Sequence, residues 1–193
     1  MDTPVQLIVG LGNPGPQYDR TRHNAGADFV LALANHYGVT LKADNKYSGL
    51  TGKAVINGKP VWLLIPTTFM NRSGQAVQAI AQFYKIAPAN LLIAHDELDL
   101  PPGTARLKLG GGHGGHNGLR SIHAAMGAEY RRLRIGIGHP GDRAEVLNYV
   151  LGRPGRDDDR AINDALIRAS GALGTWLTKG WEPAMTQLHT QSV

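Results

Sequence analysis

VQLIVG, residues Val5–Gly10, is a short apolar run that ends in glycine and predicts a buried β-strand. A loop rich in proline and glycine follows, and helical spacing then runs over Asn24–Tyr37. Leu91–His95 is a second apolar run of the same kind. Strands of continuous apolar character are typical of sheets that are covered on both faces. The pattern therefore predicts a largely parallel or mixed sheet with helices on either side.

The rest of the chain continues this alternation of strands and helices. Asn57-Gly58 lies between two strand-like segments and predicts a hairpin, which adds an antiparallel pair. At 193 residues the chain suits one domain. We expect a single α/β domain over residues 1–193, with a twisted, mixed, largely parallel sheet flanked by helices. The predicted strands are 5–10, 48–55, 59–65, 91–95, 106–109 and 132–137, and the predicted helices are 24–37, 73–84, 119–126, 144–149 and 157–178.

Composition excludes several classes of protein. The chain has no cysteine, so it can form neither disulfides nor thiolate metal sites. It contains no apolar run long enough to cross a bilayer, and its start has no signal-peptide pattern. We expect no membrane association and a cytoplasmic location.

The positive charge is concentrated in one part of the chain. The formal net charge is +5, and the window Thr104–Arg134 accounts for all of it, since Glu129 is its only acidic residue. Such a local patch is the electrostatic footprint expected for a polyanion. The basic residues of the window are Arg106, Lys108, Arg120, Arg131, Arg132 and Arg134.

A glycine-rich loop lies inside the same window. Gly110–Gly118 reads GGGHGGHNG and holds six glycines, each of which would cost ~0.5–1 kcal/mol inside a regular element. We expect close approach of its backbone to a ligand, with His116 and Asn117 on a mobile rim. A solvated linker is the alternative, although linkers favour Ser, Glu and Lys.

Gly10–Gly15, GLGNPG, matches the dinucleotide fingerprint G-x-G-x-x-G after a predicted strand. That fingerprint needs a helix to begin at once, with free N–H groups aimed at the pyrophosphate. Pro14 and Pro16 each remove an N–H, and the helix is delayed to about Asn24. We therefore predict no nucleotide cofactor. The turn instead presents Asn13 at the carboxyl end of a strand, where open α/β sheets place their sites.

Polar residues suited to acid–base chemistry gather at predicted strand ends and in loops. The chain has no nucleophile elbow, H-E-x-x-H motif or P-loop, which leaves His with Asp as the natural acid–base pair. Imidazole can take a proton from water while a carboxylate fixes its tautomer, and asparagines can steady an oxyanion. This set suits hydrolysis of an activated acyl bond without a covalent intermediate. Its members are Asn13, His23-Asn24, Asn71, His95-Asp96, His113, His116 and Asn117.

Each candidate also has a purely structural interpretation. His23 could lie on the surface before a helix that Asn24 caps. Asp96 could cap the turn at Pro102, and Asn71 could cap the helix that begins near Ser73.

A metal site is a further alternative. Its ligands would come from His23, His95, Asp96, His113 and His116. The glycine loop that carries His113 and His116 would preorganise such a site poorly, so we predict no metal.

Five segments in order carry a resemblance to a known family. They are LIVGLGNPGPQYDRTRHNAG from Leu7, PTTFMNRSG from Pro66, HDELDLPPG from His95, KLGGGHGGHNGLRSI from Lys108 and RLRIGIGHPG from Arg132. From about Leu7 to the final predicted helix, the chain resembles the bacterial-type peptidyl-tRNA hydrolases. The resemblance implies a monomeric α/β sandwich with one mixed sheet. It also implies hydrolysis of the ester that joins a peptide to the 3′ ribose of tRNA, which returns tRNA from aborted translation to use.

The resemblance also implies roles for individual residues, with no metal or cofactor. His23 falls on the catalytic histidine and Asp96 on its partner. Asn71 or Asn13 would donate to the oxyanion, and the two alternatives stay open. The glycine loop and the segment after Gly138 would gate the cleft. The other implied positions are Asn13, Asn71 and Asn117 for placing the substrate, Tyr18 and Met70 for lining the site, His116 near the cleft, and Arg106, Lys108 and Arg134 for the phosphates of the tRNA acceptor stem and 3′ end.

Two other functions compete with this one. A non-enzymatic RNA-binding module would share the basic patch but would give His23, Asp96 and the asparagines no common purpose. A metal-dependent hydrolase would use the histidines as ligands, and a chelator would reveal it.

Overall fold

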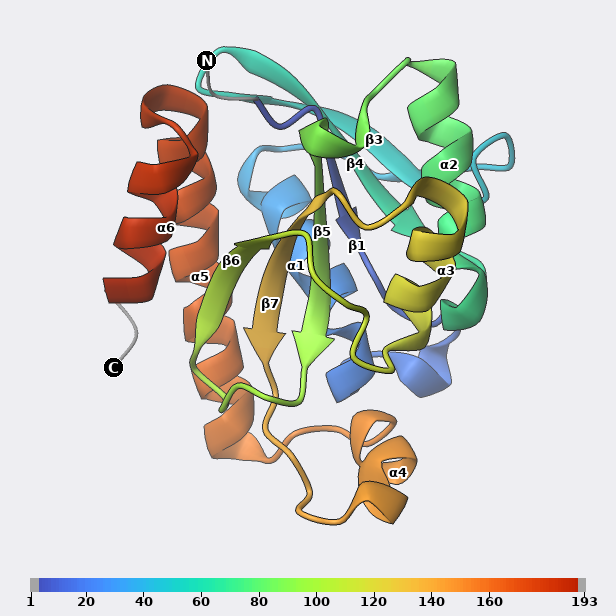
Figure 1. The fold of residues 1–193 in the computed structure, drawn as a ribbon, viewed down its shortest axis with the longest axis vertical. Helices are drawn as coiled ribbons and strands as arrows, with labels where there is room; N and C mark the ends of the chain where they lie inside the picture. The colour runs from blue at the N-terminus through green and yellow to red at the C-terminus, as the bar shows by residue number, and fades with distance from the viewer. Residues whose placement is uncertain (1–3, 191–193) are drawn as a thin grey trace.

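A computed structural model describes residues 4–190 and shows one seven-stranded sheet in the order β2-β3-β4-β1-β5-β7-β6 (Figure 1). The four central strands, β4, β1, β5 and β7, run parallel, and antiparallel strands flank them at both edges. The predicted α/β fold with a mixed sheet is therefore confirmed. The strands are β1 (Leu7–Gly10), β2 (Lys42–Asp44), β3 (Gly49–Ile56), β4 (Lys59–Pro66), β5 (Leu91–Glu97), β6 (Ala105–Leu109) and β7 (Arg131–Gly136).

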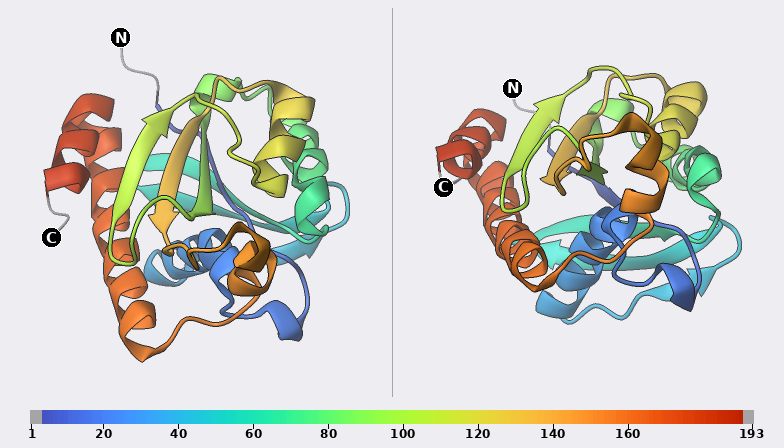
Figure 2. Two further views of the ribbon diagram at one scale, coloured as in Figure 1. Left: turned by 60° about the horizontal axis from the view of Figure 1, so that its bottom comes forward. Right: turned by 90° about the horizontal axis from the view of Figure 1, so that it is seen from below.

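Helices cover both faces of the sheet. On one face α2 and α3 lie side by side, and α1, α5 and α6 pack on the other, as the views in Figure 2 show. None of the helices within residues 4–190 has the length and apolar character that crossing a bilayer requires. The helices are α1 (Ala25–His36), α2 (Ser73–Phe83), α3 (Asn117–Met126), α4 (Val146–Val150), α5 (Arg156–Lys179) and α6 (Trp181–Thr190).

Strand β1 belongs to both hydrophobic cores. Leu7 and Val9 pack with α2 and α3, whereas Ile8 packs with α1 and α5, because successive side chains of a strand point to opposite faces. All three side chains are fully buried. This explains why the strand is continuously apolar rather than alternating.

A close backbone contact fixes the start of α1 against the centre of the sheet. A Cβ atom on Gly26 would lie 2.1 Å from the carbonyl oxygen of Ala94 in β5, so only glycine allows this approach. Leu11 strengthens the junction, since its N–H donates to Ala94 and its carbonyl accepts from Ala27. The 3₁₀ turn Arg22–Asn24, which leads into α1, is thereby held at the carboxyl end of β5.

Several predicted elements are confirmed with shifted bounds. The hairpin turn at Asn57-Gly58 has positive φ at both residues, as a type I′ turn requires. Helix α3 begins two residues earlier than predicted, at Asn117. The predicted helix 144–149 is a 3₁₀ turn, Arg143–Glu145, that continues into α4.

Candidate active site

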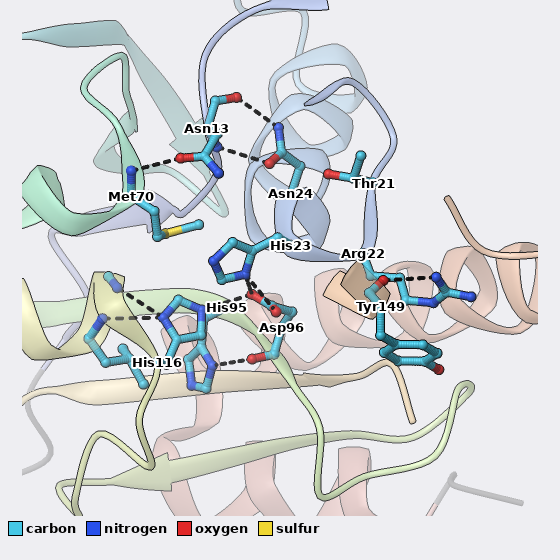
Figure 3. Close-up of polar contacts among 12 residues, drawn as sticks. Asn13, Thr21, Arg22, His23, Asn24, Met70, His95, Asp96, His116 and Tyr149 are labelled. Carbon is cyan, nitrogen blue, oxygen red and sulfur yellow. Dashed lines mark hydrogen bonds and ion pairs between the residues drawn. The ribbon is translucent and has the colours of Figure 1, made fainter. Parts of the chain in front are cut away.

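The polar residues of interest converge at the carboxyl ends of β1 and β5, next to each other in the sheet (Figure 3). Asn13 follows β1, and Asp96 is the second-to-last residue of β5. His23 comes from the 3₁₀ turn before α1. The site thus occupies the position at which open α/β sheets bind their ligands, as the sequence predicted.

His23 and Asp96 are in direct contact. His23 Nδ1 lies 2.9 Å from Oδ2 and 3.1 Å from Oδ1 of Asp96. The carboxylate is 3% exposed and the imidazole 14% exposed. Burial alone would lower the pKa of His23, but the charge of Asp96 and its hydrogen bond outweigh burial and raise this pKa above 6.5. The interpretations of His23 as a surface histidine and Asp96 as a turn cap are therefore wrong.

The same carboxylate accepts a second hydrogen bond from His116. His116 Nε2 lies 2.8 Å from Asp96 Oδ1. Burial would raise the pKa of Asp96, but the two imidazoles lower it well below its usual range. Asp96 is therefore a stable anion that two imidazoles share.

The loop before α3 is anchored, and the His116 side chain is only 10% exposed, so His116 lies within the site and not on a rim as the sequence predicted. His116 Nδ1 accepts from the backbone N–H groups of Gly118 and Leu119 and caps α3. Arg132 donates from Nε to the carbonyl of Gly110 at 3.0 Å and from Nη1 to that of Gly112 at 2.9 Å. The sequence could not show that a buried arginine holds the glycine loop in place.

Asn24 supports the turn that carries Asn13. The N–H of Asn13 donates to Asn24 Oδ1 at 2.9 Å, and Asn24 Nδ2 donates to the carbonyl of Asn13 at 3.0 Å. Asn24 is at the N-cap position of α1, as the sequence suggested, but its side chain makes no cap hydrogen bond to the helix and instead holds the Asn13 turn. Asn13 Oδ1 accepts from the N–H of Met70 at 2.8 Å, which leaves the amide NH₂ as the donor of this side chain. Figure 3 shows Asn13 and Met70 on the side of the His23 ring away from Asp96.

The other predicted substrate contacts lie around this centre. Asn71 follows Met70 in the 3₁₀ turn Met70–Arg72; the N-cap position of α2 is Arg72, so Asn71 is not the cap. Asn117 is the exposed first residue of α3. Met70 is buried, which agrees with a packing role.

Sequence reasoning missed one aromatic residue at the rim. Phe69 is 57% exposed, although large apolar side chains are usually buried. Its ring meets that of Tyr18 edge to face, with centroids 6.4 Å apart. The sequence held one signal that could have found Phe69, namely its position next to Met70 and Asn71. The exposed ring of Phe69 and the half-buried ring of Tyr18 thus form an aromatic contact beside the predicted substrate residues.

Of the five residues considered for a metal, the structure brings three together. The nearest donor atoms of His23, Asp96 and His116 all lie within 4.8 Å of one another, and in this structure the imidazoles hydrogen-bond to the carboxylate. His113 Nδ1 instead accepts from the N–H of Gly115. His95 is fully buried, and burial with the nearby His116 lowers its pKa to about 3. His95 is therefore neutral.

The basic residues of the patch fall into a buried group and a group with exposed surface. Arg106 and Lys108 of β6 pair in register with Arg134 and Arg132 of β7, so these side chains share the sheet face that carries the glycine loop. Arg134 Nε donates to Glu97 Oε1 at 2.9 Å. Arg131 and Arg132 are buried, so they add little to the exposed surface of the patch. Arg106, Lys108 and Arg134 retain exposed surface.

Comparison with known proteins supports the resemblance seen in the sequence. The family model described as peptidyl-tRNA hydrolase matches residues 7–193. The chain belongs to the peptidyl-tRNA hydrolase family. It is 59% identical over 191 residues to the peptidyl-tRNA hydrolase of Pseudomonas aeruginosa and 58% identical to that of Azotobacter vinelandii, with 98% of each chain covered. A crystal structure of peptidyl-tRNA hydrolase from Acinetobacter baumannii has a TM-score of 0.95 at 49% identity and covers 98% of this chain and 96% of its own.

Proposed function

We propose that this site hydrolyses the ester bond between peptide and tRNA, with His23 as the general base. The observation that carries the proposal is the contact between His23 Nδ1 and the buried Asp96 carboxylate. This contact holds the proton on Nδ1, so Nε2 is the nitrogen available to accept a proton. Family membership supports peptidyl-tRNA as the substrate.

The reaction follows from this arrangement. A water molecule attacks the ester carbonyl carbon while His23 Nε2 takes its proton. Asp96 stabilises the imidazolium that forms, as a carboxylate partner does in hydrolytic triads. The bond to the 3′ ribose oxygen of the tRNA then breaks, and that oxygen takes the proton back from His23. The products are a free peptide carboxylate and tRNA.

The amide of Asn13 is well placed to donate to the developing oxyanion. Its oxygen is held by the N–H of Met70, so the NH₂ group has a fixed direction before substrate binds. A preorganised donor of this kind stabilises the transition state without reorganisation. Asn71 is the alternative donor. Asn117, Tyr18 and the neighbouring Phe69 would then contact the peptide or the terminal nucleotide.

Arg106, Lys108 and Arg134 are proposed to bind the phosphates of the acceptor stem and 3′ end. They share the sheet face of the glycine loop, and Lys108 is exposed. The ion pair with Glu97 directs Arg134. We propose that the enzyme acts as a monomer in the cytoplasm, where its substrate arises.

We expect Arg106→Ala and Lys108→Ala to raise KM and leave kcat little changed. A variant that makes one phosphate contact fewer releases fewer counterions when it binds tRNA. The slope of log(kcat/KM) against log[salt] should therefore flatten by about 0.9 per lost contact. Lys42→Ala, at the exposed opposite edge of the sheet, is the matched control and should keep the wild-type slope. Unchanged slopes in both variants would move the tRNA to another surface.

A chelator separates this mechanism from a metal-dependent one. Wild-type turnover of N-acetyl-aminoacyl-tRNA should be the same with and without EDTA, with spermidine present to keep the tRNA folded. The hydrogen-bonded contacts of Asp96 with both imidazoles give the physical reason, since water activation then needs only His23. Loss of turnover that a divalent metal restores would contradict it. Binding of tRNA without turnover would favour the RNA-binding module.

A further inference from the structure

Asp96 accepts hydrogen bonds from two imidazoles, and the mechanism above uses only one of them. We propose that His116 is a positioning residue of the hydrolysis: by donating to Asp96 it divides the carboxylate between two imidazoles, so that His23 releases its proton at a lower pH than an undivided pair would allow. The proposal rests on the proposed role of His23 as the base. Its geometry is shown in Figure 3, where His23 and His116 approach the carboxylate from different sides.

The backbone around His116 fixes which of its nitrogens carries the proton. Nδ1 accepts from the N–H groups of Gly118 at 3.1 Å and Leu119 at 3.3 Å. A nitrogen can accept only while it carries no proton, so the proton of the neutral ring lies on Nε2. That Nε2–H points at Asp96 Oδ1, 2.8 Å away. His116 thus donates from Nε2 to Asp96, and the first turn of α3 fixes this orientation of the ring.

The hydrogen bond from His116 weakens the stabilisation that Asp96 gives to the protonated form of His23. Oδ1 faces both imidazoles, at 2.8 Å from His116 and 3.1 Å from His23, whereas Oδ2 faces His23 at 2.9 Å. A hydrogen bond to the charged form of a carboxylate disperses its charge and makes it a weaker partner for a nearby cation. Without His116, the whole carboxylate would stabilise the protonated form of His23.

Few other titratable or charged groups lie near Asp96 and its two imidazoles. His95 of β5 lies closest, with its ring centroid 5.4 Å from that of His116. It is neutral and donates from Nδ1 to the backbone carbonyl of Asp96 at 2.8 Å. The charge of Arg132 in β7 helps to lower the pKa of His95, while its guanidinium donates to the glycine loop. His23 and His116 are therefore the two groups that control the charge of Asp96.

Because His116 also caps α3, the test must separate its two roles. His116→Asn keeps an excellent N-cap residue but is too short to donate to Asp96. His116→Ser is a second cap variant of the same kind. His116→Gln does the reverse, since its amide has a reach similar to Nε2 of histidine and can still donate to Asp96, while glutamine caps helices poorly.

The measurement is the pH dependence of kcat/KM, with the titration of the His23 Cε1–H followed by NMR in the same free enzymes. We expect the His116→Asn and His116→Ser variants to shift both midpoints upward by about 0.5–1 pH unit. Expressed as a fraction of the wild-type activity at the same pH, the activity of these variants should then be about 3–10-fold smaller below the wild-type midpoint than above it. The His116→Gln variant should keep the wild-type midpoint even if the lost cap makes it less stable.

An unchanged midpoint of the His23 NMR titration in the Asn and Ser variants, or an equal shift in the Gln variant, would overturn the proposal. A purely structural role of His116 would lower activity equally at every pH. The NMR titration needs no turnover, so it tests the effect of His116 on His23 separately from the proposal that His23 is the base. If the His23 resonance shifts but the kinetic midpoint does not, His23 is not the base, and the shared carboxylate still stands.

Discussion

Replacing His23 with alanine is expected to lower kcat/KM for N-acetyl-aminoacyl-tRNA by about 10²–10⁴-fold, because the attacking water loses its base. His23 Nδ1 is bound to Asp96, and the ring keeps 14% of its surface exposed for contact with water or substrate. Neither Asn13 nor Asn71 can replace a base, because an amide does not accept a proton near neutral pH. Affinity for tRNA should change little, since the proposed phosphate contacts are made by β6 and β7.

Steady-state turnover together with filter binding of deacylated tRNA measures both quantities. His36→Ala is the matched control, because His36 lies exposed in the last turn of α1, at the other end of the helix that His23 precedes. It should keep wild-type turnover. A loss of less than tenfold in His23→Ala, or a matching loss of tRNA binding, would show that His23 is not the base.

The central strands could be predicted because their own apolar sequences indicate burial. Val5–Gly10 and Leu91–His95 are continuously apolar, and β1 and β5 are indeed buried on both faces. Strand β2, Lys-Ala-Asp, carries no apolar pattern and exists because it pairs with β3 at the sheet edge. Helix α6 was also missed. Only three of its ten side chains are buried, so its apolar pattern is sparse.

The site could be predicted in part. Strand-end placement and the family resemblance brought His23 and Asp96 together, and the structure confirms their contact across 73 residues of sequence. The contact of His116 with Asp96 could not be predicted, because it depends on how the buried Arg132 holds the glycine loop. Glycine-rich sequence indicates freedom of the backbone, whereas the tertiary contacts that remove this freedom come from distant residues.

Replacing Asp96 should shift the pH midpoint of activity in the opposite direction from replacing His116. Replacing Asp96 with asparagine removes the charge and the hydrogen bond that raise the pKa of His23, while burial, which lowers it, remains. In the wild type, kcat/KM should rise with pH through a midpoint above 6.5, because the base works only after it loses its proton. In Asp96→Asn, the midpoint of any remaining activity should fall below 6.5.

The rate itself should fall by about 10²–10⁴-fold in Asp96→Asn, because the new amide selects the wrong tautomer of His23. The Nε2–H of His116 needs an acceptor, so the amide oxygen should take the place of Oδ1, which lies 2.8 Å from it. The amide NH₂ then faces His23 Nδ1 in the place of Oδ2 and turns it into an acceptor. The proton of the imidazole moves to Nε2, the nitrogen that must accept from water. Asp99→Asn, an exposed change three residues away, is the control and should keep both rate and midpoint. A midpoint that rises in Asp96→Asn, or a rate within tenfold of the wild type, would refute the assignment of Asp96 as the partner that orients His23.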